Sequence, residues 1–186
     1  MARFQGWKKR YSYLDDYKPG MDGKYVYYGR HYILEGGTDA WKKYRLMLFI
    51  SSALLMALFV VSGVIEAGVF WSLWYTNLPF ALKAIASFLF VWKAIALAIE
   101  KYPVKKHIYQ KSVPWLKPCA VIVAAISVVY AVTTVICILT NREGILLSGC
   151  IIEIVLNLAA AAAGVILFKM FDRFKWDMDP SEEMEE

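Results

Sequence analysis

Four long apolar runs constrain the fold of this chain more than any other feature. They cover about residues 46–66, 78–99, 119–140 and 145–169, and each reaches the roughly 20 residues that a helix needs to cross a ~30 Å hydrocarbon core. The chain is 59% apolar, which is more than the roughly one half that is usual for soluble domains. We therefore predict an all-α integral membrane protein whose four transmembrane helices form an antiparallel up-down bundle.

The distribution of basic residues predicts which side of the membrane each segment faces. Ten Lys and Arg residues precede the first run in residues 1–45, five lie in the 100–118 loop, and three follow the fourth run. The opposite flanks hold only Arg142. Under the positive-inside rule, both termini are cytoplasmic. Short outer loops and basic inner loops further suggest the plasma (inner) membrane of a bacterium, with a multi-pass topology.

Aromatic residues mark the expected borders of the membrane. Trp71, Trp74 and Tyr75 lie between the first two runs, and Trp115 lies just before the third. Amphipathic rings favour the headgroup region, so we interpret these residues as an interfacial belt. A ligand-binding aromatic patch on the outer side is the alternative.

The third and fourth runs form an antiparallel pair, because only the stretch NREG joins them. Small side chains recur on one side of each run, and such residues let membrane helices approach closely. They are Ala120, Ala124, Ser127 and Ala131 in the third run and Gly149, Ala161 and Gly164 in the fourth. We predict tight packing within the chain, with a homodimer interface as the alternative. Near the outer end of this pair we expect Cys137 and Cys150 to be reduced, with a disulfide as the alternative.

The two ends of the chain flank the membrane domain of residues 46–169. Residues 1–45 are basic and rich in tyrosine, and we predict a β-hairpin at residues 25–34 with Gly29 and Arg30 in a type II′ turn. This hairpin is expected to pack on the membrane surface, on the cytoplasmic loop or on a partner. Residues 170–186 are expected to form the end of an interfacial helix followed by an acidic tail. The composition suits anionic lipids at the cytoplasmic face, and nucleic acid is not expected.

Ionisable and polar residues inside the apolar runs are the candidates for a ligand or ion site. Glu153 falls about 3 Å outside the bilayer midplane and Asn157 about 3 Å inside it, with Tyr130 nearly level. Lys83 leans toward the outer interface and is expected to snorkel, whereas Lys93 leans toward the membrane centre. A short carboxylate cannot snorkel from this depth. Glu153 is therefore either protonated or paired with a cation.

Two functions compete on this evidence. In the first, Glu153 pairs with Lys83 or Lys93 and the charges set the helix register of a non-catalytic anchor, scaffold or regulatory subunit of a larger membrane complex. In the second, Glu153 is a proton- or cation-binding carboxylate of a small oligomeric transporter or channel. No catalytic motif, paired cysteine or metal-ligand spacing occurs, so we expect neither an enzyme nor a cofactor or metal. We favour the first function.

Overall fold

Four long helices dominate the structure of this chain. The computed structural model describes residues 16–20, 24–65, 72–140 and 145–179. The helices are α2 (Gly37–Val64), α3 (Trp74–Ala98), α4 (Lys106–Thr140) and α5 (Leu147–Phe171). Each is long and apolar enough to cross a membrane. The predicted four-helix bundle is confirmed, although α2 and α4 begin well before the predicted spans.

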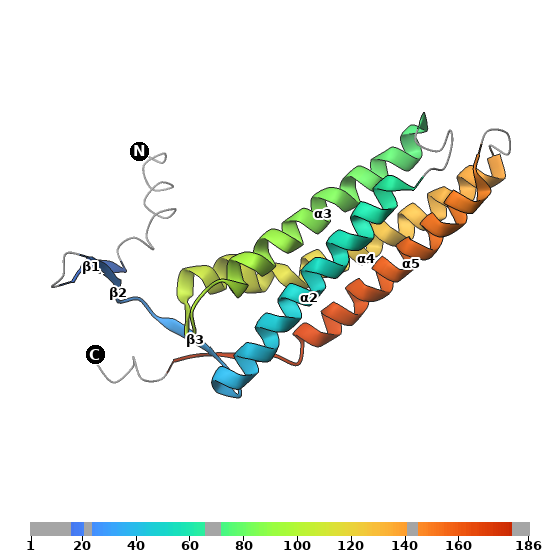
Figure 1. Ribbon diagram of the computed structural model, residues 1–186. Coiled ribbons are helices and arrows are strands. Elements are labelled where there is room, and N and C mark those ends of the chain that lie inside the picture. The colour runs from blue at the N-terminus through green and yellow to red at the C-terminus, as the bar shows by residue number, and fades with distance from the viewer. Residues whose placement is uncertain (1–15, 21–23, 66–71, 141–144, 180–186) are drawn as a thin grey trace, which may run out of the picture.

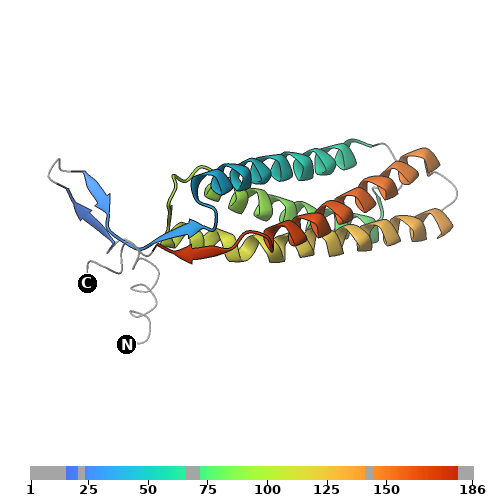
Figure 2. The same cartoon turned by 90° about the horizontal axis from the view of Figure 1, so that it is seen from below.

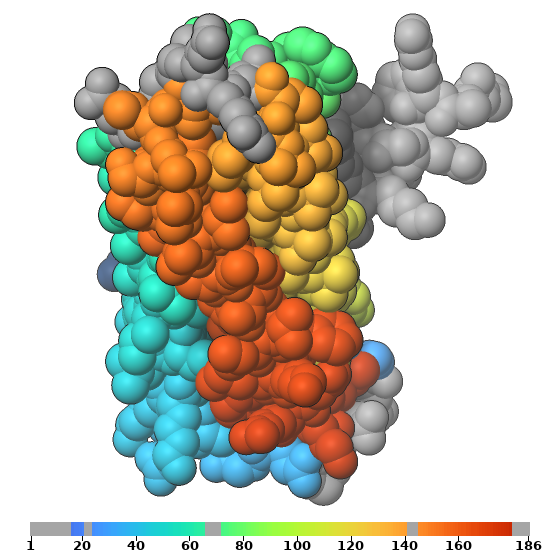
Figure 3. Space-filling view, turned by 90° about the vertical axis from the view of Figure 1, so that its right-hand side faces the viewer, coloured from blue at the N-terminus to red at the C-terminus, as the bar shows by residue number. Residues whose placement is uncertain are grey.

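The helices run in alternating directions along one common axis (Figures 1 and 2). Both described ends of the chain lie at the same end of the bundle, which we call the terminal end. The C-terminal ends of α2 and α4 and the N-terminal ends of α3 and α5 lie at the opposite end, which we call the loop end. α4 packs against α3 and α5, and Figure 3 shows α5 lying between α2 and α4.

Among the residues that the structure describes, five short strands form two small sheets at the terminal end. β1 (Tyr17–Pro19) pairs with β2 (Tyr25–Tyr27) in an antiparallel hairpin. A second sheet has the order β4-β3-β5, with β3 (His31–Leu34) between β4 (Val104–Lys105) and β5 (Trp176–Met178). We call this second sheet the cap sheet. It joins the N-terminal segment, the α3–α4 connection and the C-terminal segment.

The predicted hairpin at residues 25–34 is wrong. Two strands do form within these residues, β2 at Tyr25–Tyr27 and β3 at His31–Leu34. However, β2 pairs with β1, and β4 and β5 occupy the two edges of β3. A type II′ turn needs positive φ at its first central residue, and among the described glycines only Gly36 and Gly37 have positive φ. Those two glycines instead form the turn between β3 and α2, where φ is 93° and 66°.

The predicted interfacial helix after residue 170 is also wrong. α5 ends at Phe171, and the chain then returns along β3 as β5. Aromatic packing explains this turn, because Trp176 contacts Trp41 and Tyr44 at ring-centre distances of 5.9 and 5.6 Å. Packing of these rings stabilises the strand at the cap. Residues 180–186 of the expected acidic tail lie outside the described residues.

The residues predicted to lie at membrane borders occupy opposite ends of the bundle. Trp74 begins α3 at the loop end and is 75% exposed, with Tyr75 half-buried beside it. Trp115 is exposed on α4 near the terminal end. Trp71 lies outside the described residues. Large apolar side chains such as Ile50, Ile85 and Val155 are exposed along the helices between these ends, as a lipid-facing surface requires.

Candidate functional site

Five polar side chains meet in the interior of the bundle and form what we call the polar cluster. They are Ser62 on α2, Lys83 on α3, Tyr130 on α4, and Glu153 and Asn157 on α5. Each is at most 1% exposed. Every long helix therefore contributes at least one polar group to a single closed site.

Hydrogen bonds connect the cluster across three helices. Ser62 Oγ donates to Glu153 Oε2 at 2.7 Å. Asn157 Nδ2 donates to the same oxygen at 3.2 Å and to the Glu153 backbone carbonyl at 2.8 Å. Lys83 Nζ donates to Asn157 Oδ1 at 2.7 Å. Asn157 thus bridges the ammonium and carboxylate groups, and within the described part of the chain these two groups form no direct ion pair.

Tyr130 completes the cluster from α4. The Lys83 ammonium lies 5.7 Å from the centre of the Tyr130 ring, within the range of a cation–π interaction. The Tyr130 ring also lies 6.0 Å from the ring of Phe80. The aromatic ring therefore covers a charge that the apolar interior would otherwise leave poorly solvated.

One oxygen of the carboxyl group is left over. Glu153 Oε1 is buried and has no hydrogen-bond partner among the residues that the structure describes. A buried acceptor without a donor costs about 1–3 kcal/mol, more if it is charged. A proton or another hydrogen-bond donor that binds to this oxygen would remove that free-energy cost.

The structure contradicts the expected position of Lys83. Lys83 does not snorkel; it turns into the interior and is 1% exposed. Lys93 is half-buried and makes no hydrogen bond or ion pair with the cluster in the described structure. Position along α3 decides this, because Lys93 is ten residues, or about 15 Å, further along the helix than Lys83, which reaches Tyr130 on α4 and Asn157 on α5. Glu153 and Asn157 share one face of α5 because they are four residues apart.

Ser62 is a member of the cluster that the sequence did not reveal. A single serine in an apolar helix carries no charge and no spacing signal, and its hydroxyl commonly bonds to its own helix. The only usable signal is the presence of Glu153 at a similar depth, which requires donors from neighbouring helices.

The predicted small residues lie where α4 meets α5. A Cβ atom added to Gly164 would lie 2.7 Å from the Ala120 carbonyl oxygen and 2.9 Å from Ala124 Cβ. Ala120, Ser127, Ala131, Gly149 and Ala161 are also buried. The contact of Gly164 with Ala120 and Ala124 is the close packing within the chain that the small residues predict. Cys137 and Cys150 are buried free thiols near the loop end.

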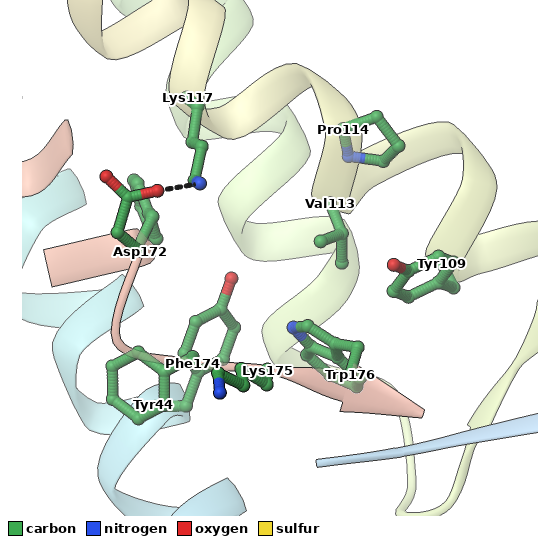
Figure 4. Close-up of a pocket in the computed structure, with 10 residues that line it drawn as sticks. Tyr44, Tyr109, Val113, Pro114, Lys117, Asp172, Phe174, Lys175 and Trp176 are labelled. Atoms are coloured by element: carbon green, nitrogen blue, oxygen red, sulfur yellow. Dashed lines mark hydrogen bonds and ion pairs between the residues drawn. The ribbon is translucent and has the colours of Figure 1, made fainter. Parts of the chain in front are cut away.

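A cavity of about 380 Å³ opens at the terminal end, and we call it the terminal cavity (Figure 4). It lies between the beginning of α2, the N-terminal part of α4 and the chain from the end of α5 to β5. Tyr44, Tyr109, Phe174 and Trp176 form its aromatic wall. Its charged residues are Lys117, Asp172 and Lys175, and Lys117 forms an ion pair with Asp172.

Comparison of the chain with protein-family models, curated proteins and solved structures finds no match. The function must therefore be argued from the polar cluster and the terminal end alone.

Proposed function

We propose that this chain is a non-catalytic membrane protein that anchors or scaffolds a larger assembly at the plasma membrane, with both termini in the cytoplasm. The closed polar cluster carries the proposal. Its five side chains are at most 1% exposed, and they come from all four long helices. A scaffold needs a bundle held in one arrangement, whereas transport needs a site that water or solute reaches.

The physical role of such a cluster is to specify how the helices fit together. Apolar surfaces alone discriminate poorly among helix rotations in lipid, because lipid tails are as apolar as leucine. Sliding or rotating α3 would remove Lys83 from Asn157 and leave both groups unpaired in an apolar environment. The cluster therefore penalises alternative packings of the bundle.

The β1–β2 hairpin supplies the surface through which a partner is bound. It projects beyond the bundle at the terminal end (Figure 2). Tyr25 is 74% exposed, Tyr28 is 64% exposed, and Lys18 and Lys24 are exposed beside them. Tyrosine is enriched at protein–protein interfaces, and the lysines complement negative charge on a partner. The hairpin therefore suits an acidic protein surface.

A site-specific photo-cross-link in native membranes tests this function. A photoreactive amino acid at Tyr25 should give one adduct of defined mass, and the charge reversals Lys18→Glu and Lys24→Glu should abolish that adduct. Ile85, which is exposed on the lipid-facing side of α3, is the matched control position. Absence of an adduct from the hairpin, together with migration as an isolated chain in mild detergent, would contradict the scaffold.

The free oxygen of Glu153 favours a second candidate, a proton-coupled transport role. Infrared difference spectroscopy of the wild type and Glu153→Gln between pH 5 and 9 separates the two. A carboxyl band that titrates in this window supports a site that protons reach from solvent. A carboxylate band that does not change with pH supports the closed cluster of a scaffold. Proton flux in proteoliposomes that Glu153→Gln abolishes would independently establish transport.

A further inference from the structure

We propose that the terminal cavity binds one phosphate group, carried by the headgroup of an anionic phospholipid. This inference goes beyond the scaffold function and uses different residues, so neither depends on the other. It rests on the position of the cavity, on its donors, and on a carboxylate that competes for the same lysine.

The position of the cavity matches the level of lipid phosphates. Tyr44 precedes the first predicted apolar span, Lys117 precedes the third, and Asp172 follows the fourth, each by only a few residues. The exposed Trp115 on α4 marks the same level as an interfacial aromatic residue. A cavity at this depth opens where headgroups meet the hydrocarbon core.

Hydrogen-bond donors with no protein acceptor face the cavity. In Figure 4 the Tyr44 hydroxyl and the indole nitrogen of Trp176 face the same space as the Lys117 ammonium. Tyr44 is only 1% exposed, and in the described part of the chain neither its hydroxyl nor the Trp176 N–H has an acceptor. The indole can only donate, so this space is suited to an acceptor-rich ligand.

The charges select an anion from among acceptor-rich ligands. Lys117 and Lys175 contribute two positive charges against the single negative charge of Asp172. Lysine binds phosphate as a point charge, and such charge-assisted bonds are about twice as strong as neutral ones. The aromatic wall is held rigidly, with Tyr44–Phe174 and Tyr109–Trp176 ring centres 4.7 and 5.4 Å apart. The donors are therefore positioned before a ligand arrives.

Without a ligand, Asp172 is the ion-pair partner of Lys117. A phosphate group replaces this carboxylate as the partner of Lys117, and Asp172, which is half-exposed, then turns to water. The carboxylate is thus a competitor of the ligand. This arrangement makes a prediction that a purely structural ion pair does not make: removal of the charge of Asp172 strengthens binding, whereas removal of the charge of Lys117 weakens it.

Binding of a short-chain phosphatidylglycerol to the purified full-length chain tests the proposal, with isothermal calorimetry or native mass spectrometry as the measurement. We expect one molecule per chain. Lys117→Gln should weaken binding about tenfold, which is the loss of one charge-assisted bond. Tyr44→Phe should weaken it about threefold. Asp172→Asn should tighten it about threefold. Lys169→Gln, which removes an exposed charge outside the cavity, should leave it unchanged.

Titration with inorganic phosphate distinguishes the source of the phosphate group. Much weaker binding than that of the lipid supports a headgroup. Equal binding keeps the phosphate site but overturns the lipid assignment. The whole proposal is overturned if Lys169→Gln weakens binding as much as Lys117→Gln, or if Asp172→Asn weakens it. Thermal melts of each variant ensure that only folded protein is compared, and Tyr44→Phe keeps the packing of the ring.

Discussion

The polar cluster and the terminal cavity each place a lysine beside an aromatic ring, but in opposite surroundings. Lys83 lies 5.7 Å from the Tyr130 ring centre and is 1% exposed, whereas Lys117 lies 6.0 Å from the Phe168 ring centre with 41% of its side chain exposed. In the middle of the bundle, only protein groups are available as partners. At the terminal end, water competes with them.

Burial decides whether a charged group stabilises the fold or remains available to a ligand. Removing one partner inside the bundle leaves an uncompensated polar group, which is expensive. Removing one partner at the terminal end leaves a group that water can solvate, so stability changes little and binding changes more. The following predictions test this difference.

The largest effect is expected for Lys83→Met. The substitution leaves Asn157 Oδ1 without its donor and Glu153 without its nearest cation, so stability should fall by about 3–5 kcal/mol. Chemical or thermal unfolding in detergent measures it. Lys93→Met, in the same helix but half-buried outside the cluster, should change stability by less than about 1 kcal/mol.

Adding Glu153→Gln to Lys83→Met should restore part of the loss, because it removes the uncompensated charge. Additive losses in the double variant would show that Lys83 and Glu153 are not coupled. Equal losses for Lys83→Met and Lys93→Met would show that membership of the cluster does not decide the cost.

A smaller effect is expected for Gly164→Val. The new side chain would meet the Ala120 carbonyl oxygen at the α4–α5 contact, and overpacking of this kind costs about 1–3 kcal/mol. The melting temperature in detergent should fall. Ala162→Val, two residues away on the exposed side of α5, is the control and should be nearly neutral. An unchanged melting temperature for Gly164→Val would argue against close packing of these helices.

A local effect is expected for Trp176→Ala at the cap sheet. The variant loses ring contacts with Trp41, Tyr44 and Tyr109, each of which contributes about 0.5–1.5 kcal/mol beyond area burial. Hydrogen exchange in β3 and β5 should accelerate, while exchange in the middle of α4 stays slow. Faster exchange throughout the bundle would mean that the cap and the membrane domain unfold together.

The smallest effect is expected at the half-buried pair of Lys105 and Glu100, whose charged atoms are 3.3 Å apart. Burial lowers the pKa of Lys105, but the hydrogen bond and charge of Glu100 outweigh it and hold this pKa above its ordinary value of 10.5. The pair therefore stabilises the fold fully below pH 10.5, and this contribution is lost as the pH rises through the folded-state pKa.

Glu100→Gln should remove about 0.2–1 kcal/mol at pH 7, and less at high salt. Denaturant unfolding at pH values rising from 7 to 12 measures the difference between the variant and the wild type. A difference that does not shrink as the pH rises would contradict an ionic origin.

The candidate site was predictable in part, and the residues show why. Glu153 stood out because a short carboxylate near the midplane cannot reach water, and depth alone placed Asn157 and Tyr130 beside it. Depth also placed Lys83 nearer to Glu153 than Lys93, but whether Lys83 turns inward or snorkels was not predictable, because depth along a helix does not give the rotation of that helix about its axis. Ser62 carried no signal, since a lone serine is compatible with a bond to its own helix.

The cap sheet was the least predictable part. Strand pairing of β3 with β4 and β5 joins segments far apart in the chain, and local turn chemistry at Gly29 and Arg30 suggested a nearer partner. A strand of three or four residues has too few side chains to specify its partner, so the aromatic packing of Trp176 decided it.

The sequence by itself determined that the chain has four apolar helices, because the length and hydropathy of each run are local properties. It also determined that Glu153 needs partners, because the cost of a buried charge depends on depth. Only the tertiary structure decided that Lys83 turns inward and which strands pair. Both outcomes depend on how the surfaces of several segments fit together, and that fit is a property of the whole packed chain rather than of any one segment.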